Sequence, residues 1–356
     1  MAVFTEGAIK YEFEHSDAFT GFEIDHSSSQ ITAVAKNILI DVMRFRRSTG
    51  LHTDCVASPC EKCLAPHLSK VATAVERREP VTFVLPAFPG KSPNLAKVFG
   101  PLPDMAERRA LEFLQHLCDR IKQVYQPGAR IILCSDGRVF SDVVGMRDED
   151  VTAYQQELSK MIADLGLTSI SSFNLEELYE ESGFDQMRGQ LMQQYGESVD
   201  FLKASVSNGD QETVRLYCGI TRFLVEDAMF PGQKKSRTAI QKECRIRAYE
   251  VIQRSQAWSE LIEARFADAV RLSIHPQGCG AKKLGIRLIN STFGPENWQT
   301  PWHGVAVEVG GQIILLKRAQ AEALGARLVT QFGRPSHYVL TEKEKLSGLR
   351  GVAYES

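Results

Sequence analysis

The first half of the chain alternates short apolar runs with amphipathic stretches. The short runs are rich in β-branched residues and bounded by turn residues, which is typical of buried strands. The amphipathic stretches follow the helical period, and one opens with a capping box formed by Asp104 and Glu107. The predicted elements are a helix from Ile31, a cysteine-bearing loop that ends near Pro66, a strand at 81–85, a helix from Asp104, a strand at 130–134, a polar loop from Ser135, a helix at about 150–165 and a strand at 167–173. This alternation predicts right-handed crossovers, a parallel sheet and a Rossmann-like α/β core.

In the second half of the chain the pattern changes first to a helical one and then to one of strands. Residues 175–266 are almost wholly helical in pattern, and they are followed by a strand at 270–275, a hairpin with Gly310 and Gly311 at its turn, a short helix, and strands near 327–331 and 337–340. We therefore predict a polar N-terminal arm at 1–30, an α/β core at 31–265 with a helical insertion at about 175–265, and a smaller C-terminal β-rich part at 266–356 that completes the active site.

The balance of charges and the hydropathy pattern argue against several classes of protein. The 356 residues carry 42 Lys and Arg against 44 Asp and Glu, so no strong field draws the chain to nucleic acid or to an anionic membrane. No apolar run is long enough to span a membrane, and the first residues lack the pattern of a secretory leader. The eight cysteines are ordinary usage for this length. We expect a cytoplasmic protein with reduced thiols.

Two polar loops follow predicted strands, at the edge of the sheet where ligands of open α/β folds bind. The first loop holds Lys91, Ser92 and Asn94 between prolines. It is not a nucleotide P-loop, because that motif needs a glycine where Leu85 stands, and no glycine-rich dinucleotide motif follows a strand. The alternative is a rigid turn with a solvated lysine.

The second loop, Ser135 onward, concentrates arginines and carboxylates. Arg138 and Arg147 suit an anionic substrate, and Asp142 suits a general base. Surface ion pairs are the alternative interpretation.

The strand at 270–275 alternates, so that Arg271, Ser273 and His275 share one face. This polar row is expected to line a cavity, with His275 at the strand end available for proton transfer. A solvent-facing strand would give the same pattern. Farther along, Trp302 and His303 lie in a second candidate segment, for which the alternative is an anchored turn with a packed tryptophan.

A cysteine-rich segment offers four potential metal ligands. Cys55, Cys60, Cys63 and His67 form the pattern C-x4-C-x2-C-x3-H, which tetrahedral zinc would accept. Structural zinc sites more often use two separated ligand pairs, and a chain of this size needs no metal to fold. We expect free thiols near a substrate channel and no bound metal.

Four segments taken together resemble the isonitrile (isocyanide) synthases, a family that includes PvcA, IsnA and the yeast spore-wall dityrosine formation proteins. The segments are residues 85–94, 135–138, 271–276 and 300–304, and the similarity runs from about residue 30 to 345. The resemblance implies an enzyme that joins the α-amine of L-tyrosine or L-tryptophan to carbon 2 of ribulose 5-phosphate and keeps that carbon as the isonitrile carbon. It further implies no cofactor and a downstream Fe(II)/2-oxoglutarate oxygenase.

Within this resemblance the polar residues receive expected roles. The expected catalytic residues are Lys91, Asp142, His275 and His303. The expected substrate-binding residues are Ser92, Asn94, Arg138, Arg147, Arg271, Lys283 and Trp302. Lys91 could act electrostatically or react with the sugar ketone itself. Another cofactor-independent sugar-phosphate transferase or lyase, or a non-catalytic small-molecule binding protein, remain alternatives, and specificity for tyrosine or tryptophan stays open.

Overall fold

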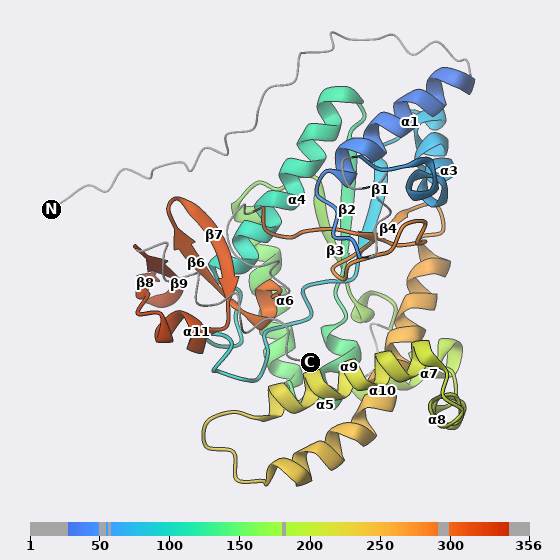
Figure 1. Cartoon of the computed structure of the whole chain (residues 1–356). Helices are drawn as coiled ribbons and strands as arrows, with labels where there is room; N and C mark the ends of the chain where they lie inside the picture. The colour runs from blue at the N-terminus through green and yellow to red at the C-terminus, as the bar shows by residue number, and fades with distance from the viewer. Residues whose placement is uncertain (1–27, 50–54, 56–57, 180–182, 291–298, 342–356) are drawn as a thin grey trace, which may run out of the picture.

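A parallel sheet of five strands forms the centre of the molecule in the computed structural model, which describes residues 28–49, 55, 58–179, 183–290 and 299–341 (Figure 1). The strand order is β3-β2-β1-β4-β5, and every pairing within the sheet is parallel. The strands are β1 (Val81–Leu85), β2 (Ala129–Cys134), β3 (Ile170–Phe173), β4 (Val270–Ser273) and β5 (Leu284–Gly285). The α/β class and the Rossmann-like parallel core predicted from the sequence are confirmed.

Helices cover both faces of this sheet. One face packs against α1 (Ser28–Met43), α3 (Glu61–Arg77), α4 (Met105–Val124) and α6 (Asp148–Asp164). The other face packs against α5 (Gly137–Val144), α7 (Phe184–Tyr195) and α10 (Arg237–Arg265). The short helix η1 (Leu175–Glu177) follows β3, and α8 (Val199–Ser207) and α9 (Gln211–Ala228) complete the helical region. The helices turn the apolar faces predicted from the sequence toward the sheet. Burial of these faces stabilises the packing of the helices on both sides of the sheet.

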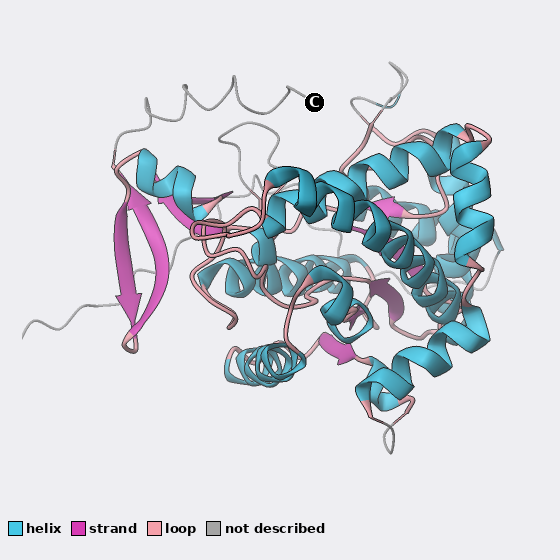
Figure 2. Cartoon of the chain, turned by 90° about the horizontal axis from the view of Figure 1, so that it is seen from below, coloured by secondary structure: helices cyan, strands magenta, loops and turns pink. Residues whose placement is uncertain are grey.

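A second, smaller sheet stands apart from the first (Figure 2). Its order is β7-β6-β9-β8, and it mixes parallel and antiparallel pairs. It contains β6 (Val305–Val309), β7 (Gln312–Leu316), β8 (Arg327–Gln331) and β9 (Arg334–Leu340), with η2 (Pro301–His303) before it and α11 (Arg318–Ala323) within it. Ala306, Ile313 and Leu315 pack on the first turn of α4. The predicted C-terminal hairpin, helix and strands are confirmed.

Three local predictions differ from the structure. The cysteine-bearing loop does not end at Pro66, because α3 already begins at Glu61 and contains the proline. Pro66 removes one intrahelical hydrogen bond, and the apolar face of α3, with Leu64, Val71 and Val75 buried, keeps the helix continuous on both sides of it. The polar loop after β2 is largely the helix α5, which is too short to display a period. The strand β4 pairs with β1, so residues 270–285 belong to the parallel sheet rather than to the C-terminal strands.

Two further expectations concern the ends and the surroundings of the chain. The arm predicted at 1–30 lies almost entirely outside the described residues. Within the described residues, no helix combines the length and the apolar character needed to cross a membrane.

Candidate active site

The loops after β1 and β2 lock together at the carboxyl edge of the sheet. Phe88 adopts a left-handed backbone conformation with φ of 59°, which is rare for a bulky residue and persists only where the surroundings enforce it. The Ser135 hydroxyl donates to the Phe88 carbonyl at 2.9 Å. A Cβ at Gly137 would lie 1.6 Å from the Pro89 carbonyl oxygen, so only glycine fits there. These contacts hold the two loops in a fixed arrangement at the carboxyl ends of the strands.

Lys91 is fully buried in an ion-pair cluster. Its ammonium lies 2.8 Å from Asp104 Oδ2 and 2.7 Å from Glu107 Oε2, and it donates to the Pro301 carbonyl at 2.9 Å. Burial opposes the charge, but the two carboxylates outweigh it and raise the pKa of Lys91. All three ammonium donors therefore have partners, and this arrangement does not fit the catalytic role expected for Lys91.

Ser92 and Asn94 tie the first loop to the end of α9. The Ser92 hydroxyl donates to Asp227 Oδ1 at 3.0 Å, and the Asn94 amide donates to the carbonyls of Glu226 and Met229 at 3.0 and 3.2 Å. Both side chains are buried. Their polar groups are bonded within the protein, an arrangement that does not fit the contact with substrate expected for them.

Trp302 is also buried. Its ring packs against Phe88, with the ring centroids 5.3 Å apart, and its carbonyl accepts from the Ser92 amide at 2.9 Å. The packed tryptophan that the sequence left as an alternative is what the structure shows. This packing stabilises the strained backbone turn at Phe88.

Arg138 lies inside the protein and not in an open site. Its guanidinium forms ion pairs with Asp148 Oδ1 at 2.9 Å and with Glu176 Oε1 at 2.7 Å, and it stacks 3.7 Å from the ring centroid of Phe184. Only 1% of its side chain is exposed. The predicted binding of an anionic substrate by Arg138 does not fit, because the protein's own carboxylates occupy its guanidinium.

Asp142 and Arg147 also have partners on the helices around them. Arg254 of α10 donates two hydrogen bonds to the Asp142 carboxylate, at 2.5 and 2.9 Å. Partial burial opposes ionisation of Asp142, but the pairing with Arg254 outweighs it and lowers the pKa of Asp142. Arg147 pairs with Asp150 at 2.7 Å and its side chain is 74% exposed. The surface ion pairs kept as the alternative are therefore what forms here, and neither residue reaches the strand ends.

Arg271, at the carboxyl edge of the sheet, has guanidinium nitrogens that no described residue of the protein hydrogen-bonds. It sits on β4 beside Val84 of β1, with its side chain largely buried against α10. Its Nη2 makes a long contact of 3.5 Å with the Ser259 hydroxyl of α10, and its buried Nε and Nη1 have no hydrogen-bond partner among the described residues. Burial lowers the pKa of Arg271, with Cys134 and Asp136 opposing this shift. A buried guanidinium without partners is costly unless a ligand completes it.

His275 and Lys283 flank this arginine in the segment that follows β4. Both side chains are exposed at the surface of the site. Desolvation by the surrounding protein lowers the pKa of His275, and the neighbouring charges of Arg47 and Lys283 lower it further. Desolvation and the nearby Arg271 likewise lower the pKa of Lys283. His275 is therefore held as a neutral imidazole near pH 7, which suits a proton acceptor.

Asp136 lies in the segment 135–138 but was not among the predicted site residues. It follows β2 directly, and burial raises its pKa to about 7, against the opposing charge of Arg271. A carboxyl group with that pKa can donate a proton near neutrality. Its position at the end of a central strand was the signal available in the sequence.

His303 lies on the opposite side of the site, in η2. Its Nδ1 is 3.0 Å from the Thr300 hydroxyl, and its Nε2 is 4.0 Å from Asp227 Oδ2. Burial and the nearby Lys97 lower the pKa of His303 to about 3. His303 is therefore neutral near pH 7, which does not suit it to donate a proton in the catalytic role expected for it, although its neutral ring can still hydrogen-bond a ligand.

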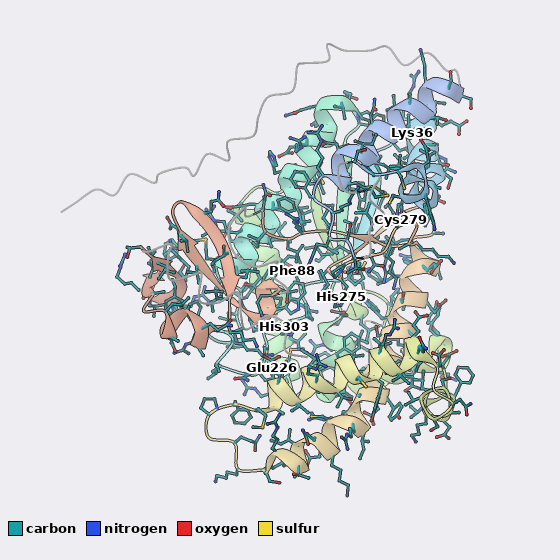
Figure 3. The ribbon with its side chains drawn as sticks, viewed as in Figure 1. Lys36, Phe88, Glu226, His275, Cys279 and His303 are labelled. Carbon is teal, nitrogen blue, oxygen red and sulfur yellow. The ribbon has the colours of Figure 1, made fainter. Side chains whose placement is uncertain are left out.

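The strand ends thus bring together Arg271, His275, Lys283, Asp136 and His303. Figure 3 shows His275 and His303 in the centre of the molecule beside Phe88, between the sheet and the helical region. The charge on His275 contributes to the lowered pKa of His303, which agrees with their closeness in that view. Lys91 lies beside His303, whose pKa its charge also lowers, but its ammonium is paired within the protein. Arg138, Asp142 and Arg147 pair with charged residues of the surrounding helices. The site is therefore built more from the later strand than from the earlier loops.

Comparison with known proteins identifies the family. The L-tryptophan isonitrile synthase AmbI2 of Fischerella ambigua is 47% identical over 315 residues, which are 88% of this chain and 94% of that protein. The L-tyrosine isonitrile synthase of Xenorhabdus nematophila is 40% identical over 91% of this chain and 97% of its own length. The chain belongs to the isonitrile synthase family. The resemblance drawn from four sequence segments is thereby confirmed.

Two further comparisons agree with this family. The profile of the family described as pyoverdine/dityrosine biosynthesis protein matches residues 71–329. The crystal structure of the PvcA protein from Pseudomonas aeruginosa has a TM-score of 0.81 and 41% identity, covering 86% of this chain and 100% of that one. The arrangement of a parallel sheet with a separate C-terminal sheet is thus a shared property of this isonitrile synthase and PvcA.

Proposed function

We propose that this isonitrile synthase converts the α-amino group of L-tryptophan or L-tyrosine to an isonitrile, with ribulose 5-phosphate as the carbon donor. The observation that carries the proposal is the 47% identity, over 88% of the chain, to a protein named as an L-tryptophan isonitrile synthase. Relatives named for tyrosine are nearly as similar, at 40% and 42% identity. The aromatic amino acid follows from these names, and the sugar phosphate follows from the family resemblance.

The charges at the sheet edge support two anionic substrates. An amino acid presents a carboxylate and a sugar phosphate presents a phosphate, and arginine matches the oxygens of both in a bidentate way. Nε and Nη1 of Arg271 are donors without a partner among the described residues, so each edge of the guanidinium has a donor free for an anion, and Lys283 adds a second cation nearby. Binding of an anion here would relieve the unpaired, buried guanidinium.

The titratable groups support the proton transfers of imine formation. Attack of the amine on the ketone requires one group to take a proton from nitrogen and another to give a proton to the departing oxygen. His275, with its lowered pKa, is suited to the first role, and Asp136, with a pKa of about 7, is suited to the second. Arg271 lies close enough to Asp136 to oppose the rise of its pKa, and Lys283 lies close to both His275 and Arg271, which supports a common substrate site.

A direct assay tests this function. The purified protein is incubated with each aromatic amino acid and ribulose 5-phosphate, and the product is examined by mass and by the infrared band of the isonitrile group. We expect an isonitrile that carries carbon 2 of a labelled sugar. A different product from the same substrates would favour another sugar-phosphate transferase or lyase, and substrate binding without turnover would favour a binding protein.

Replacement of Arg271 by glutamine is expected to raise KM for the substrate that it binds. Charge-assisted hydrogen bonds contribute roughly 1.5–3 kcal/mol, which corresponds to about 10- to 100-fold in affinity. Steady-state kinetics with each substrate varied in turn measure the change. Arg130→Gln, at an exposed arginine on β2 of the same sheet, is the control and should leave both KM values unchanged. Unaltered kinetics in Arg271→Gln would assign this residue to the fold alone.

The two titratable groups predict a bell-shaped pH profile of kcat/KM. Activity should fall at acidic pH as His275 becomes protonated, below its ordinary pKa of 6.5, and should fall above about pH 7 as Asp136 loses its proton. Asp136→Asn should lower the maximum and remove the alkaline limb at about pH 7. Because substrate groups also titrate, the profiles of the two proteins are compared with the same substrates. Persistence of the alkaline limb in Asp136→Asn would exclude this carboxyl as the proton donor.

We also propose that an Fe(II)/2-oxoglutarate oxygenase acts on the product. The support is the family resemblance, together with the chemistry of the product, which keeps the carboxylate and β-carbon of the amino acid. Incubation of the purified isonitrile with such an oxygenase, followed by mass analysis, tests this step. An isonitrile left unchanged by the enzyme would contradict it.

A further inference from the structure

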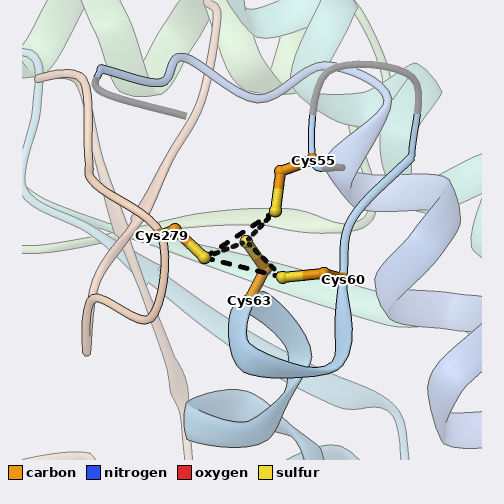
Figure 4. Close-up of side chains that lie close together, drawn as sticks. All are labelled: Cys55, Cys60, Cys63 and Cys279. Carbon is orange, nitrogen blue, oxygen red and sulfur yellow. Dashed lines mark hydrogen bonds between the residues drawn. The ribbon is translucent and has the colours of Figure 1, made fainter. Parts of the chain in front are cut away.

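Four cysteines from distant parts of the chain converge on one point. Cys55 and Cys60 precede α3, Cys63 lies in its first turn, and Cys279 comes from the segment that follows β4 (Figure 4). Their sulfur atoms all lie within 4.8 Å of one another. Cys279 is 216 residues from Cys63, and no sequence motif links them. His67, the fourth ligand suggested by sequence spacing, is not among them.

The spacing of the sulfur atoms matches a tetrahedron. In a zinc tetrathiolate the Zn–S bond is about 2.3 Å, which places neighbouring sulfurs about 3.8 Å apart. Five of the six separations are 3.8 Å for Cys55–Cys63 and Cys55–Cys279, 3.9 Å for Cys60–Cys63, 3.5 Å for Cys60–Cys279 and 3.3 Å for Cys63–Cys279. A disulfide would bring one pair to about 2 Å. The Cys55–Cys60 pair lies within 4.8 Å, so all four sulfurs surround one point at distances compatible with a central ion.

The backbone around the cysteines is shaped to hold them there. Cys60 caps α3 and Cys63 lies in its first turn, where the Cys63 amide donates to the Cys60 carbonyl at 2.9 Å. The positive end of a helix stabilises thiolates at this position. On the other side, Gly280 follows Cys279 with φ of 80°, and a Cβ there would lie 3.0 Å from the Lys62 side chain. Arg46 donates to the Cys55 carbonyl.

We propose that Cys55, Cys60, Cys63 and Cys279 bind one zinc ion in a closed, structural site. Four thiolates fill the tetrahedral positions that zinc prefers, and no position is left for water or substrate, which separates this site from a catalytic metal centre. The site is distinct from the substrate site at the strand ends, and it does not depend on the proposed isonitrile activity. It replaces the expectation of free thiols.

The zinc site joins the N-terminal helices to the loop that carries His275. Cys279 lies four residues after His275 and four before Lys283, so the ion fixes the middle of this segment. Backbone hydrogen bonds from Thr49 to Gln277 at 3.1 Å and from Gln277 to Arg47 at 3.1 Å secure its start. Given the proposed function, loss of zinc should loosen His275 as well as the fold.

The test measures metal and does not require turnover. The full chain is purified without chelators, and its metal content is determined by mass spectrometry of the elements. We expect one zinc per chain. Replacement by cobalt should give the intense visible absorption of a tetrahedral cobalt thiolate. Absence of metal, or iron in place of zinc, would overturn the proposal.

Matched variants identify the ligands. Cys279→Ser should lose the metal, whereas His67→Gln should keep one equivalent, because His67 lines a neighbouring pocket and is not a ligand. Cys218→Ser, at an exposed cysteine of α9, is the second control. If Cys279→Ser does not fold, a thiol count on the denatured wild-type chain decides. With chelator, all eight cysteines should react, whereas four missing thiols would indicate two disulfides and overturn the zinc site.

Discussion

Replacement of Lys91 by methionine is expected to lower the free energy of unfolding by about 3–5 kcal/mol, because it leaves a buried carboxylate cluster without its cation. Asp104 already has its pKa raised to about 7 by burial, with Glu107 adding to the shift. Without the ammonium, one of the two carboxyls must stay protonated or the helix start must open. Urea unfolding followed by circular dichroism measures the loss.

Two further variants test whether the unpaired carboxylates cause the loss of stability. Lys91→Met combined with Glu107→Gln should recover part of the stability, because it removes the carboxylate along with its partner. Lys122→Met, at an exposed lysine near the end of α4, should change little. If Lys91 instead reacts with the sugar ketone, borohydride will trap the sugar on Lys91, and Lys91→Met will unfold normally but lose all turnover.

Replacement of His275 by alanine is expected to lower kcat by about 100- to 10,000-fold, the usual effect of removing a positioned acid or base. The side chain is exposed, so the folded structure should be kept. KM should change much less than kcat, because the proton is transferred only in the reaction step. Steady-state kinetics with saturating ribulose 5-phosphate measure both constants.

His337→Gln provides the comparison for this variant. His337 lies in β9 of the second sheet, where its Nδ1 is 3.0 Å from the Ser336 hydroxyl. Its replacement should leave kcat unchanged. A near-normal kcat in His275→Ala across the pH range would make His275 structural, and proton acceptance would then need another group at the strand ends.

The fold could be predicted from the sequence to a large extent, because its elements carry strong local signals. The strand at Val81–Leu85 is an uninterrupted apolar run, and the capping box at Asp104 and Glu107 marks a helix start that the structure reproduces. The helix α5 and the pairing of β4 with β1 could not be predicted in this way. The first is too short for a period, and the second depends on contacts between distant segments.

The site was harder to predict than the fold, because charge alone does not show which partner a residue has. Lys91 and Arg138 looked like substrate ligands, yet carboxylates from other elements surround both. Arg271 was predicted to bind substrate from its place on the strand, but its unpartnered nitrogens appear only in three dimensions. The cysteines show the same limit, since spacing within one segment suggested His67 where the fold brings Cys279.

The placement of β4 between β1 and β5 also sets the order in which this chain can fold. Phe83 pairs with Val270, so the central strand of the sheet gains its second neighbour only after most of the chain has left the ribosome. Pairing across such long separations is slow, because the loop must close before the contacts can form. During synthesis β1 therefore exposes one edge while the helical region forms. An exposed apolar strand edge invites pairing with other chains, so the yield of folded protein should fall when translation outpaces the closure of this sheet.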